Sequence, residues 1–254
     1  MSAGALDTRT RRESTAPREA VDLSIVIPAY NEEARLPASL GAIAAYLSAK
    51  ASAPRVEVLV VDDGSSDATG ARAEEAARRH ALPLRVLRLA ENRGKGAAVR
   101  AGCLEAAGAL VLVSDADFST PVYEWEKLAA AGAPVAIGSR ALDEALVKEK
   151  QPFFRQAMGK LFNRLVRLVA VPGIHDTQCG FKLFTREAAR EIFSRAKVDR
   201  FAYDVEALLL ARQLGYAIAE VPVLWFNSAD SRVTLFGGAQ AYWDVLRIRL
   251  TTKA

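Results

Sequence analysis

The stretch Val111-Leu-Val-Ser-Asp115-Ala-Asp117-Phe-Ser-Thr-Pro121 joins a short apolar run to two aspartates that stand one residue apart. An apolar run of this length, here 109–113, predicts a buried strand. The polar residues after it place both carboxylates at the carboxyl end of that strand, where open α/β sheets bind their ligands. Two carboxylates at this spacing suit Mg²⁺ or Mn²⁺ carrying a substrate diphosphate. The same pattern also fits a polar loop without a metal.

The composition is that of a folded α/β protein. The chain has 254 residues, 51% of them hydrophobic and 25% charged, which suits one large domain with a full core. No apolar run approaches the ~18 residues that a membrane-spanning helix needs. The N-terminal stretch is rich in Ser, Thr, Ala and Arg and has no apolar signal-peptide core. We therefore expect a disordered tail at 1–22 and a single domain at 23–254.

Cysteine use and charge narrow the class further. Cys103 and Cys179 are too few for a disulfide framework and lack metal-site spacing, which favours reduced thiols in the cytoplasm. The net charge is +4, but residues 148–200 alone hold 12 Lys and Arg against 5 Asp and Glu. Such a surplus suits phosphates or an anionic membrane surface. A solvated helical face explains the count more simply.

Strand-like and helix-like segments alternate along the chain. Strands are expected at 23–28, 56–61, 84–89, 109–113, 135–140 and 217–224. The later helices are expected at 187–195, 203–214 and 239–250, and the stretch His175–Lys182 looks irregular. This order, with near-continuous apolar strands, predicts a mostly parallel sheet flanked by helices on both faces.

Polar residues follow three of the expected strands: Tyr30, Asn31 and Glu32; Asp62 and Asp63; Asp115 and Asp117. The carboxyl ends of parallel strands share one edge of a sheet, so these loops are expected to converge on a nucleotide-type site. Gly94-Lys95-Gly96 adds a cation at a helix start, which suits phosphate. Neither a Walker loop nor a GxGxxG turn is present, which disfavours P-loop and dinucleotide-binding proteins.

The segment Phe153–Val171 is amphipathic, with apolar residues at helical spacing and Arg or Lys between them. It fits a core-packing helix with a solvated basic face. It also fits an interfacial helix that lies on anionic lipid. The sequence favours core packing and leaves the second possibility open.

Four stretches together resemble the family 2 glycosyltransferases of GT-A fold: Ser24–Glu33, Val60–Asp67, Asn92–Gly96 and Asp115–Asp117. A fifth, Asp176-Thr-Gln-Cys-Gly-Phe-Lys-Leu-Phe184, resembles the dolichyl-phosphate β-glucosyltransferases, which are relatives of the dolichyl-phosphate mannose synthases. The resemblance covers roughly 23–250. It implies inverting transfer of glucose from UDP-glucose to a polyprenyl phosphate, assisted by Mg²⁺ or Mn²⁺, by a peripheral enzyme at the cytoplasmic face of the cell membrane.

The resemblance also implies roles for individual residues on the donor side. The uridine and its ribose would be held by Pro28, Tyr30, Glu32 and Asp63, with Asp62 supporting them. Lys95 would lie near the nucleotide. Asp115 would help to hold the donor and its metal, and Asp117 would be the direct metal ligand.

On the acceptor side the resemblance implies three cations around the lipid phosphate, Arg140, Arg155 and Lys182, and a loop with Ser231 and Arg232 that closes over the donor. A phosphate monoester is ionised near neutral pH, with a second pKa of about 6, and needs cations more than a strong base. Asp176 would act as a base on a hydroxyl acceptor or would orient Lys182 for a phosphate acceptor. The second role is preferred.

Two departures from the family pattern keep alternatives open. Ser119 stands where the synthases often carry a metal-binding Gln, and a polar tail stands where the eukaryotic enzymes carry a membrane helix. A soluble transferase acting on a hydroxyl, a mannosyltransferase using GDP-mannose, a nucleotidyltransferase and a non-catalytic nucleotide-sugar module are the alternatives. The expected partners are a UDP-sugar, a polyprenyl phosphate and a membrane surface, and not nucleic acid. The oligomeric state is not predicted.

Overall fold

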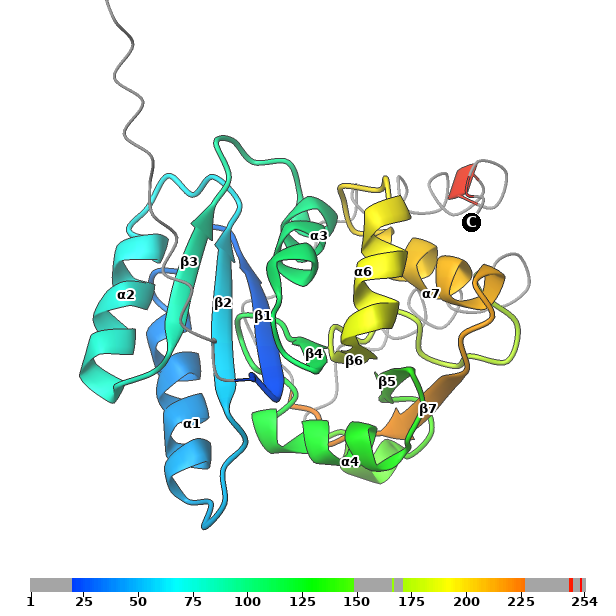
Figure 1. Cartoon of the computed structure of the whole chain (residues 1–254), viewed down its shortest axis with the longest axis horizontal. Helices are drawn as coiled ribbons and strands as arrows, with labels where there is room; N and C mark the ends of the chain where they lie inside the picture. The colour runs from blue at the N-terminus through cyan, green and yellow to red at the C-terminus, as the bar shows by residue number, and fades with distance from the viewer. Residues whose placement is uncertain (1–19, 149–165, 167–170, 227–246, 249–251, 253–254) are drawn as a thin grey trace, which may run out of the picture.

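The computed structural model describes residues 20–148, 166, 171–226, 247–248 and 252. Within them one sheet of seven strands runs in the order β3-β2-β1-β4-β6-β5-β7 (Figure 1). The strands are β1 Leu23–Ala29, β2 Val56–Asp62, β3 Leu84–Arg88, β4 Leu110–Val113, β5 Val135–Ser139, β6 Lys182–Thr185 and β7 Ile218–Pro222.

The sheet is mostly parallel, as predicted. Strands β3, β2, β1 and β4 run parallel to their neighbours, and so do β5 and β7. Strand β6 is antiparallel to both β4 and β5. Strand β6 is not predictable from the sequence, because four residues are too few to show a periodicity and their pairing depends on strands distant in the chain.

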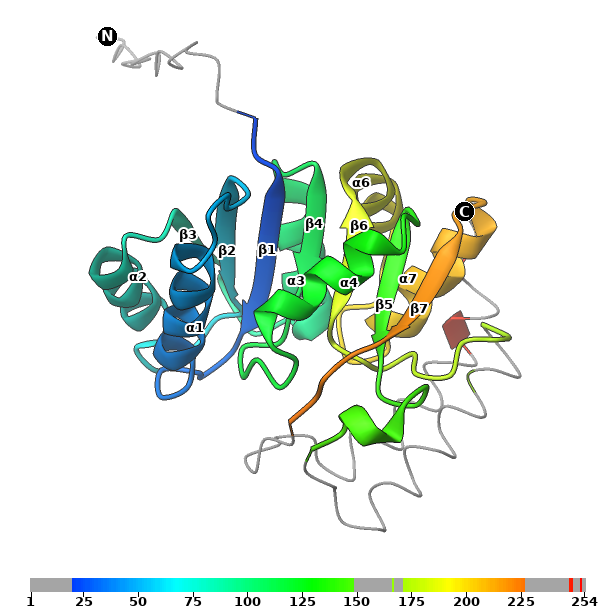
Figure 2. The same ribbon diagram turned by 90° about the horizontal axis from the view of Figure 1, so that it is seen from below.

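Helices cover both faces of the sheet (Figure 2). One face packs against α1 Leu36–Ser48, α2 Thr69–His80 and α4 Trp125–Ala130, and the other against α3 Lys95–Glu105, α6 Arg186–Arg195 and α7 Tyr203–Gln213. Two 3₁₀ turns, η1 Val122–Glu124 and η2 Glu144–Leu146, follow strands β4 and β5. The alternation of strand side chains produces the two layers, since Ile25 and Ile27 face one layer and Val26 the other.

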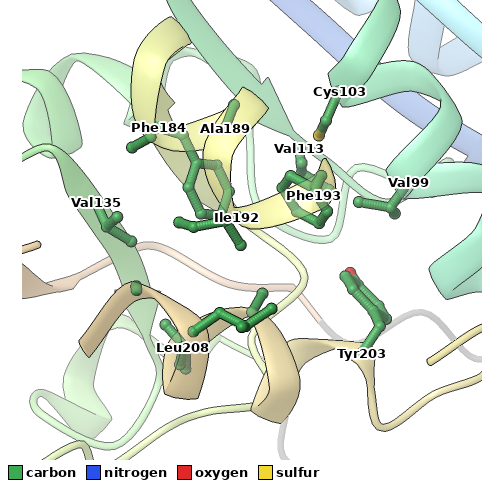
Figure 3. Close-up of a cluster of buried hydrophobic side chains, with 14 of the residues drawn as sticks. Val99, Cys103, Val113, Val135, Phe184, Ala189, Ile192, Phe193, Tyr203 and Leu208 are labelled. Carbon is green, nitrogen blue, oxygen red and sulfur yellow. The ribbon is translucent and has the colours of Figure 1, made fainter. Parts of the chain in front are cut away.

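The core beneath α6 and α7 supports β6, the strand that follows the predicted acceptor residue Asp176 (Figure 3). The rings of Phe184 on β6 and Phe193 on α6 meet edge to face with their centroids 5.5 Å apart. Figure 3 shows Tyr203 at the margin of this cluster, with its hydroxyl turned toward the interior. Val166 and Val171 are fully buried in the same cluster. The rest of the amphipathic segment 153–171 lies outside the described residues, so its interfacial role stays a prediction.

The start of α3 carries Lys95, which the sequence predicts to lie near the nucleotide. Gly94 precedes it with φ +114°, and a Cβ atom there would lie 2.5 Å from the Asp199 carbonyl oxygen. Only glycine combines this backbone angle with so close an approach. The turn therefore fixes where Lys95 leaves the backbone. No helix in the described part of the chain is long and apolar enough to cross a bilayer.

Candidate functional site

The three polar strand ends meet at one edge of the sheet, as the sequence predicted. The amide of Asp63 donates to the Ala29 carbonyl at 2.9 Å, and the amide of Ser114 donates to the Val26 carbonyl at 3.0 Å. Strand β1 lies between β2 and β4. The chain runs from β1 outward to β2 and β3 and then crosses back to β4 on the other side of β1, so the strand order reverses beside β1. This switch point is where doubly wound sheets bind nucleotides.

Asp62 and Asp63 shape the loops on the β2 side. The two oxygens of Asp63 accept hydrogen bonds from the amides of Arg93 and Gly94, at 2.9 and 2.8 Å. Asp62 is fully buried and accepts from the Ser65 amide at 2.8 Å. A carboxylate can accept more than one hydrogen bond at each oxygen, so Asp63 keeps capacity for a ribose hydroxyl.

The loop after β1 presents an aromatic ring beside these acids. Tyr30 is 42% exposed, whereas Glu32 is buried. The Glu32 carboxylate pairs with the Arg35 guanidinium through bonds of 2.5 and 2.7 Å. Pro28, on β1, is held in register opposite Val61 of β2. These positions are compatible with the predicted uridine pocket, and the individual contacts to uridine stay predictions.

Lys95 and Asp115 form an ion pair across the centre of the site. The ammonium lies 2.5 Å from Asp115 Oδ1 and 5.7 Å from the centre of the Tyr203 ring. Burial alone would raise the pKa of Asp115, but Lys95, Lys182 and Arg140 outweigh it and hold that pKa below its ordinary value. Burial likewise opposes the charge on Lys95, and the nearby carboxylates, Asp115 foremost, raise its pKa. Both groups are therefore charged at neutral pH.

Asp117 fits a divalent cation best. One of its oxygens accepts from the Ser119 amide at 3.0 Å, and the other accepts no hydrogen bond from the described residues. Those residues contain no group of three or more His, Cys, Asp or Glu that could hold a metal by itself. Mg²⁺ commonly binds one or two carboxylates and completes its shell with water and substrate phosphates. Asp117, with Asp115 beside it, fits a cation that arrives with a diphosphate.

Arg140 and Asp176 form the second ion pair of the site. The Asp176 carboxylate accepts from Arg140 Nε at 2.7 Å, from Nη2 at 2.8 Å and from the Arg140 amide at 3.0 Å. Burial would raise the pKa of Asp176, but Arg140 lowers it below the ordinary value. We expected Asp176 to orient Lys182; it binds Arg140 instead.

The Arg140 guanidinium is held on more than one side. It lies 5.5 Å from the centre of the Trp225 ring, in cation–π range. Glu220 on β7 accepts the Asp176 amide at 2.8 Å and so fixes the residue that holds Arg140. The Arg140 side chain is 29% exposed. It therefore presents a fixed cation to solvent at the site.

Lys182 is placed differently from the sequence-based expectation. Its ammonium hydrogen-bonds the Asp204 carboxylate and the Cys179 carbonyl, and its side chain is 1% exposed. To contact an acceptor phosphate it would have to leave Asp204. The acceptor role of Lys182 stays a prediction, and the burial of its ammonium argues against it. Arg155, Ser231 and Arg232 lie outside the described residues.

Sequence reasoning missed Asp204, Glu220 and Trp225. Asp204 stands in the first turn of α7. Acidic residues are common there because they interact favourably with the helix dipole, so Asp204 gave no specific signal. Glu220 is the one charged residue in the short strand Ile-Ala-Glu-Val-Pro, which was a usable signal of a buried or paired carboxylate. Nothing local marks Trp225 as a neighbour of Arg140.

Solved structures with this fold are known. The glucosyl-3-phosphoglycerate synthase of Mycobacterium tuberculosis, crystallised with Mn²⁺, UDP and phosphoglyceric acid, superposes with a TM-score of 0.66 at 19% identity. The match covers 91% of this chain and 78% of that one. It shows that the fold is the GT-A glycosyltransferase fold.

Sequence relatives are much closer. The dolichyl-phosphate β-glucosyltransferase of Drosophila melanogaster is 44% identical over 248 residues, which cover 91% of this chain and 76% of that protein. The enzyme of the same name from Homo sapiens is 40% identical, over 90% of this chain and 75% of that protein. The family model described as glycosyl transferase family 2 matches residues 24–193. The chain therefore belongs to glycosyl transferase family 2.

Proposed function

We propose that this chain is an inverting glucosyltransferase that moves glucose from UDP-glucose to a polyprenyl phosphate. The observation that carries the proposal is the state of Asp176. This carboxylate is fully engaged by Arg140, and its lowered pKa makes it a poor proton acceptor at neutral pH. A hydroxyl acceptor needs a base at this place, whereas an ionised phosphate needs a fixed cation. The site offers the cation.

The donor side fits a nucleoside diphosphate. Asp63 and Tyr30 border the predicted uridine pocket, and Lys95 brings an ammonium to the centre of the site. Mg²⁺ or Mn²⁺, held by Asp117 and Asp115, would neutralise the diphosphate and stabilise UDP as it leaves. Relatives named dolichyl-phosphate β-glucosyltransferase support glucose as the sugar and a lipid phosphate as the acceptor.

On the acceptor side, Arg140 would orient the lipid phosphate for attack. Arg140 is clamped by Asp176 and stacked near Trp225, so its guanidinium is fixed before a substrate arrives. A planar guanidinium can bind two phosphate oxygens at once and hold the third for attack on the anomeric carbon. Inversion follows from a single in-line displacement by that oxygen.

A screen of labelled donors and acceptors tests the proposal. UDP-glucose and GDP-mannose are each incubated with a short-chain polyprenyl phosphate, with the matching polyprenyl alcohol and with soluble sugars, in Mn²⁺ or Mg²⁺. We expect product only from UDP-glucose and the lipid phosphate. Transfer to the alcohol or to soluble sugars would overturn the acceptor, and transfer from GDP-mannose would overturn the donor.

We propose further that the enzyme works at the cytoplasmic face of a membrane as a peripheral protein. A polyprenyl phosphate resides in a bilayer, so the site has to approach the lipid surface. The basic surplus at 148–200 supplies charge for an anionic surface. The segment 153–171, for which the sequence favours core packing and leaves interfacial docking open, is the contact that we propose.

A further inference from the structure

The Cys179–Gly180 turn lies directly against the donor-side aspartate. Strand β6 pairs with β4 so that Lys182 stands opposite Val113. Two residues further along this antiparallel register, Gly180 comes to face Asp115. A Cβ atom on Gly180 would lie 2.2 Å from Asp115 Oδ2. Gly180 is not among the glycines with positive φ, so glycine is needed here for space rather than for backbone freedom.

A buried ion pair holds this turn in place. Lys182 extends its ammonium to the Cys179 carbonyl and to the Asp204 carboxylate, and the two charged side chains are 1% and 5% exposed. Loss of one partner from such a pair leaves an uncompensated buried charge, whereas an apolar pair of similar volume is often tolerated. The pair thus ties the turn on Asp115 to the first turn of α7.

The first turn of α7 supports the other lysine as well. Tyr203, which precedes Asp204, places its ring 5.7 Å from Lys95 Nζ. Glu206, in the same first turn, accepts from the amides of Lys197 and Val198 at 2.8 to 3.0 Å. The next residue in that loop, Asp199, accepts the Ala97 amide at the start of α3. Tyr203, Asp204 and Glu206, all in the first turn of α7, therefore fix the surroundings of the Lys95–Asp115 pair.

We infer that Asp204 and Lys182 are positioning residues of the donor site. Their pair presses the Cys179–Gly180 turn against Asp115, and Asp115 in turn holds the Lys95 ammonium where the diphosphate binds. Neither residue touches a substrate. The inference rests on the proposed function for the donor site and replaces the acceptor role that the sequence predicted for Lys182.

Binding of UDP and of uridine, measured by calorimetry with Mn²⁺ present, tests the inference. Three variants are compared with the wild type: Asp204→Asn, Gly180→Ala and the double variant Lys182→Met/Asp204→Leu. We expect Asp204→Asn and Gly180→Ala each to weaken UDP binding about tenfold or more. Uridine binding should be unchanged, because uridine is expected at Asp63, on the other side of β1.

The double variant separates positioning from direct contact. It removes both charges and keeps the buried volume, so it loses the tie to the Cys179 carbonyl without leaving a lone buried charge. We therefore expect UDP affinity to fall less than in Asp204→Asn, and the KM for the lipid phosphate to stay unchanged. Glu187→Gln, which changes an exposed acid on α6, is the matched control and should alter nothing. Thermal unfolding confirms that each variant is folded at the assay temperature.

Two results would overturn the inference. One is a Gly180→Ala variant that binds UDP with wild-type affinity. This variant changes no charge, and its UDP affinity can be measured even if Asp204→Asn fails to fold. The other is a double variant that binds UDP normally but has a raised KM for the lipid phosphate, since that would make Lys182 an acceptor ligand. A wild-type protein that does not bind UDP would instead overturn the proposed function.

Discussion

At the scale of single residues, Asp117 is the position on which the proposed donor chemistry depends. Asp117→Ala removes the carboxylate that we propose as the direct metal ligand. One oxygen of this carboxylate accepts no hydrogen bond from the described residues. We expect glucosyl transfer to fall at least about 100-fold, because even outer-shell changes at metal sites cost 10–100-fold. Transfer is measured over a Mn²⁺ titration, with thermal unfolding as the control for folding. Transfer that persists at the wild-type rate would show that the metal lies elsewhere.

Asp176 leads to a prediction about acid stability. A carboxyl whose pKa is lower in the folded protein adds stability that is complete above its unfolded value, 3.8, and is lost as the pH falls through the folded value. Asp176→Asn should therefore lower the free energy of unfolding by about 2–4 kcal/mol at pH 7. The difference from wild type should narrow below about pH 4, because the unfolded chain takes up a proton at Asp176 at a higher pH than the folded protein does.

Urea unfolding at several pH values measures this difference. Asp22→Asn is the matched control, because Asp22 also pairs with an arginine, Arg55, but at the surface, with side chains 48% and 53% exposed. Exposed pairs add little stability, so its curve should follow wild type closely. A gap between Asp176→Asn and wild type that is the same at every pH would argue against the Arg140 pairing.

At the scale of elements, packing of β6 against α6 holds the stretch Asp176–Phe184 against the sheet. Phe193→Ala removes one ring of the edge-to-face pair with Phe184, and we expect a loss of about 3–5 kcal/mol in the free energy of unfolding. Leu104→Ala on α3 is the control, since Leu104 is 40% exposed and its truncation leaves no cavity. Denaturant unfolding reports both. Equal losses of unfolding free energy in the two variants would mean that the neighbouring side chains fill the space of the Phe193 ring at no cost in stability.

The same elements show what could be read from the sequence and what could not. The parallel strands β1, β2 and β4 were predictable, because apolar runs and the polar residues after them are local signals. Because these strands pair in parallel, their carboxyl ends lie at the same edge of the sheet. The partner of Lys182 was not predictable, since Asp204 reaches it only through the insertion of β6 and the packing of α7. Asp176 was recognised as important, but its partner could not be chosen among nearby cations without the tertiary structure.

At the scale of the whole molecule, the proposed lipid acceptor implies binding to a bilayer surface. Co-sedimentation should show tighter binding to vesicles with anionic lipid than to neutral vesicles, and high salt should weaken it, because the attraction is between charges. Replacing Arg164 and Arg167, two cations of the predicted contact segment, with Gln should weaken binding without changing UDP affinity. Equal binding to neutral and anionic vesicles would count against an electrostatic contact.

The antiparallel insertion of β6 also has a consequence for how the protein is made. Strands β4 and β5 leave the ribosome before β6, and in the sheet β6 pairs with both. Until it arrives, each of them has an open edge, which is a template for pairing with another chain. The same insertion brings Gly180 against Asp115 and Asp176 to Arg140. Nascent chains should therefore close the open edges between β4 and β5 and form these two contacts in one folding step.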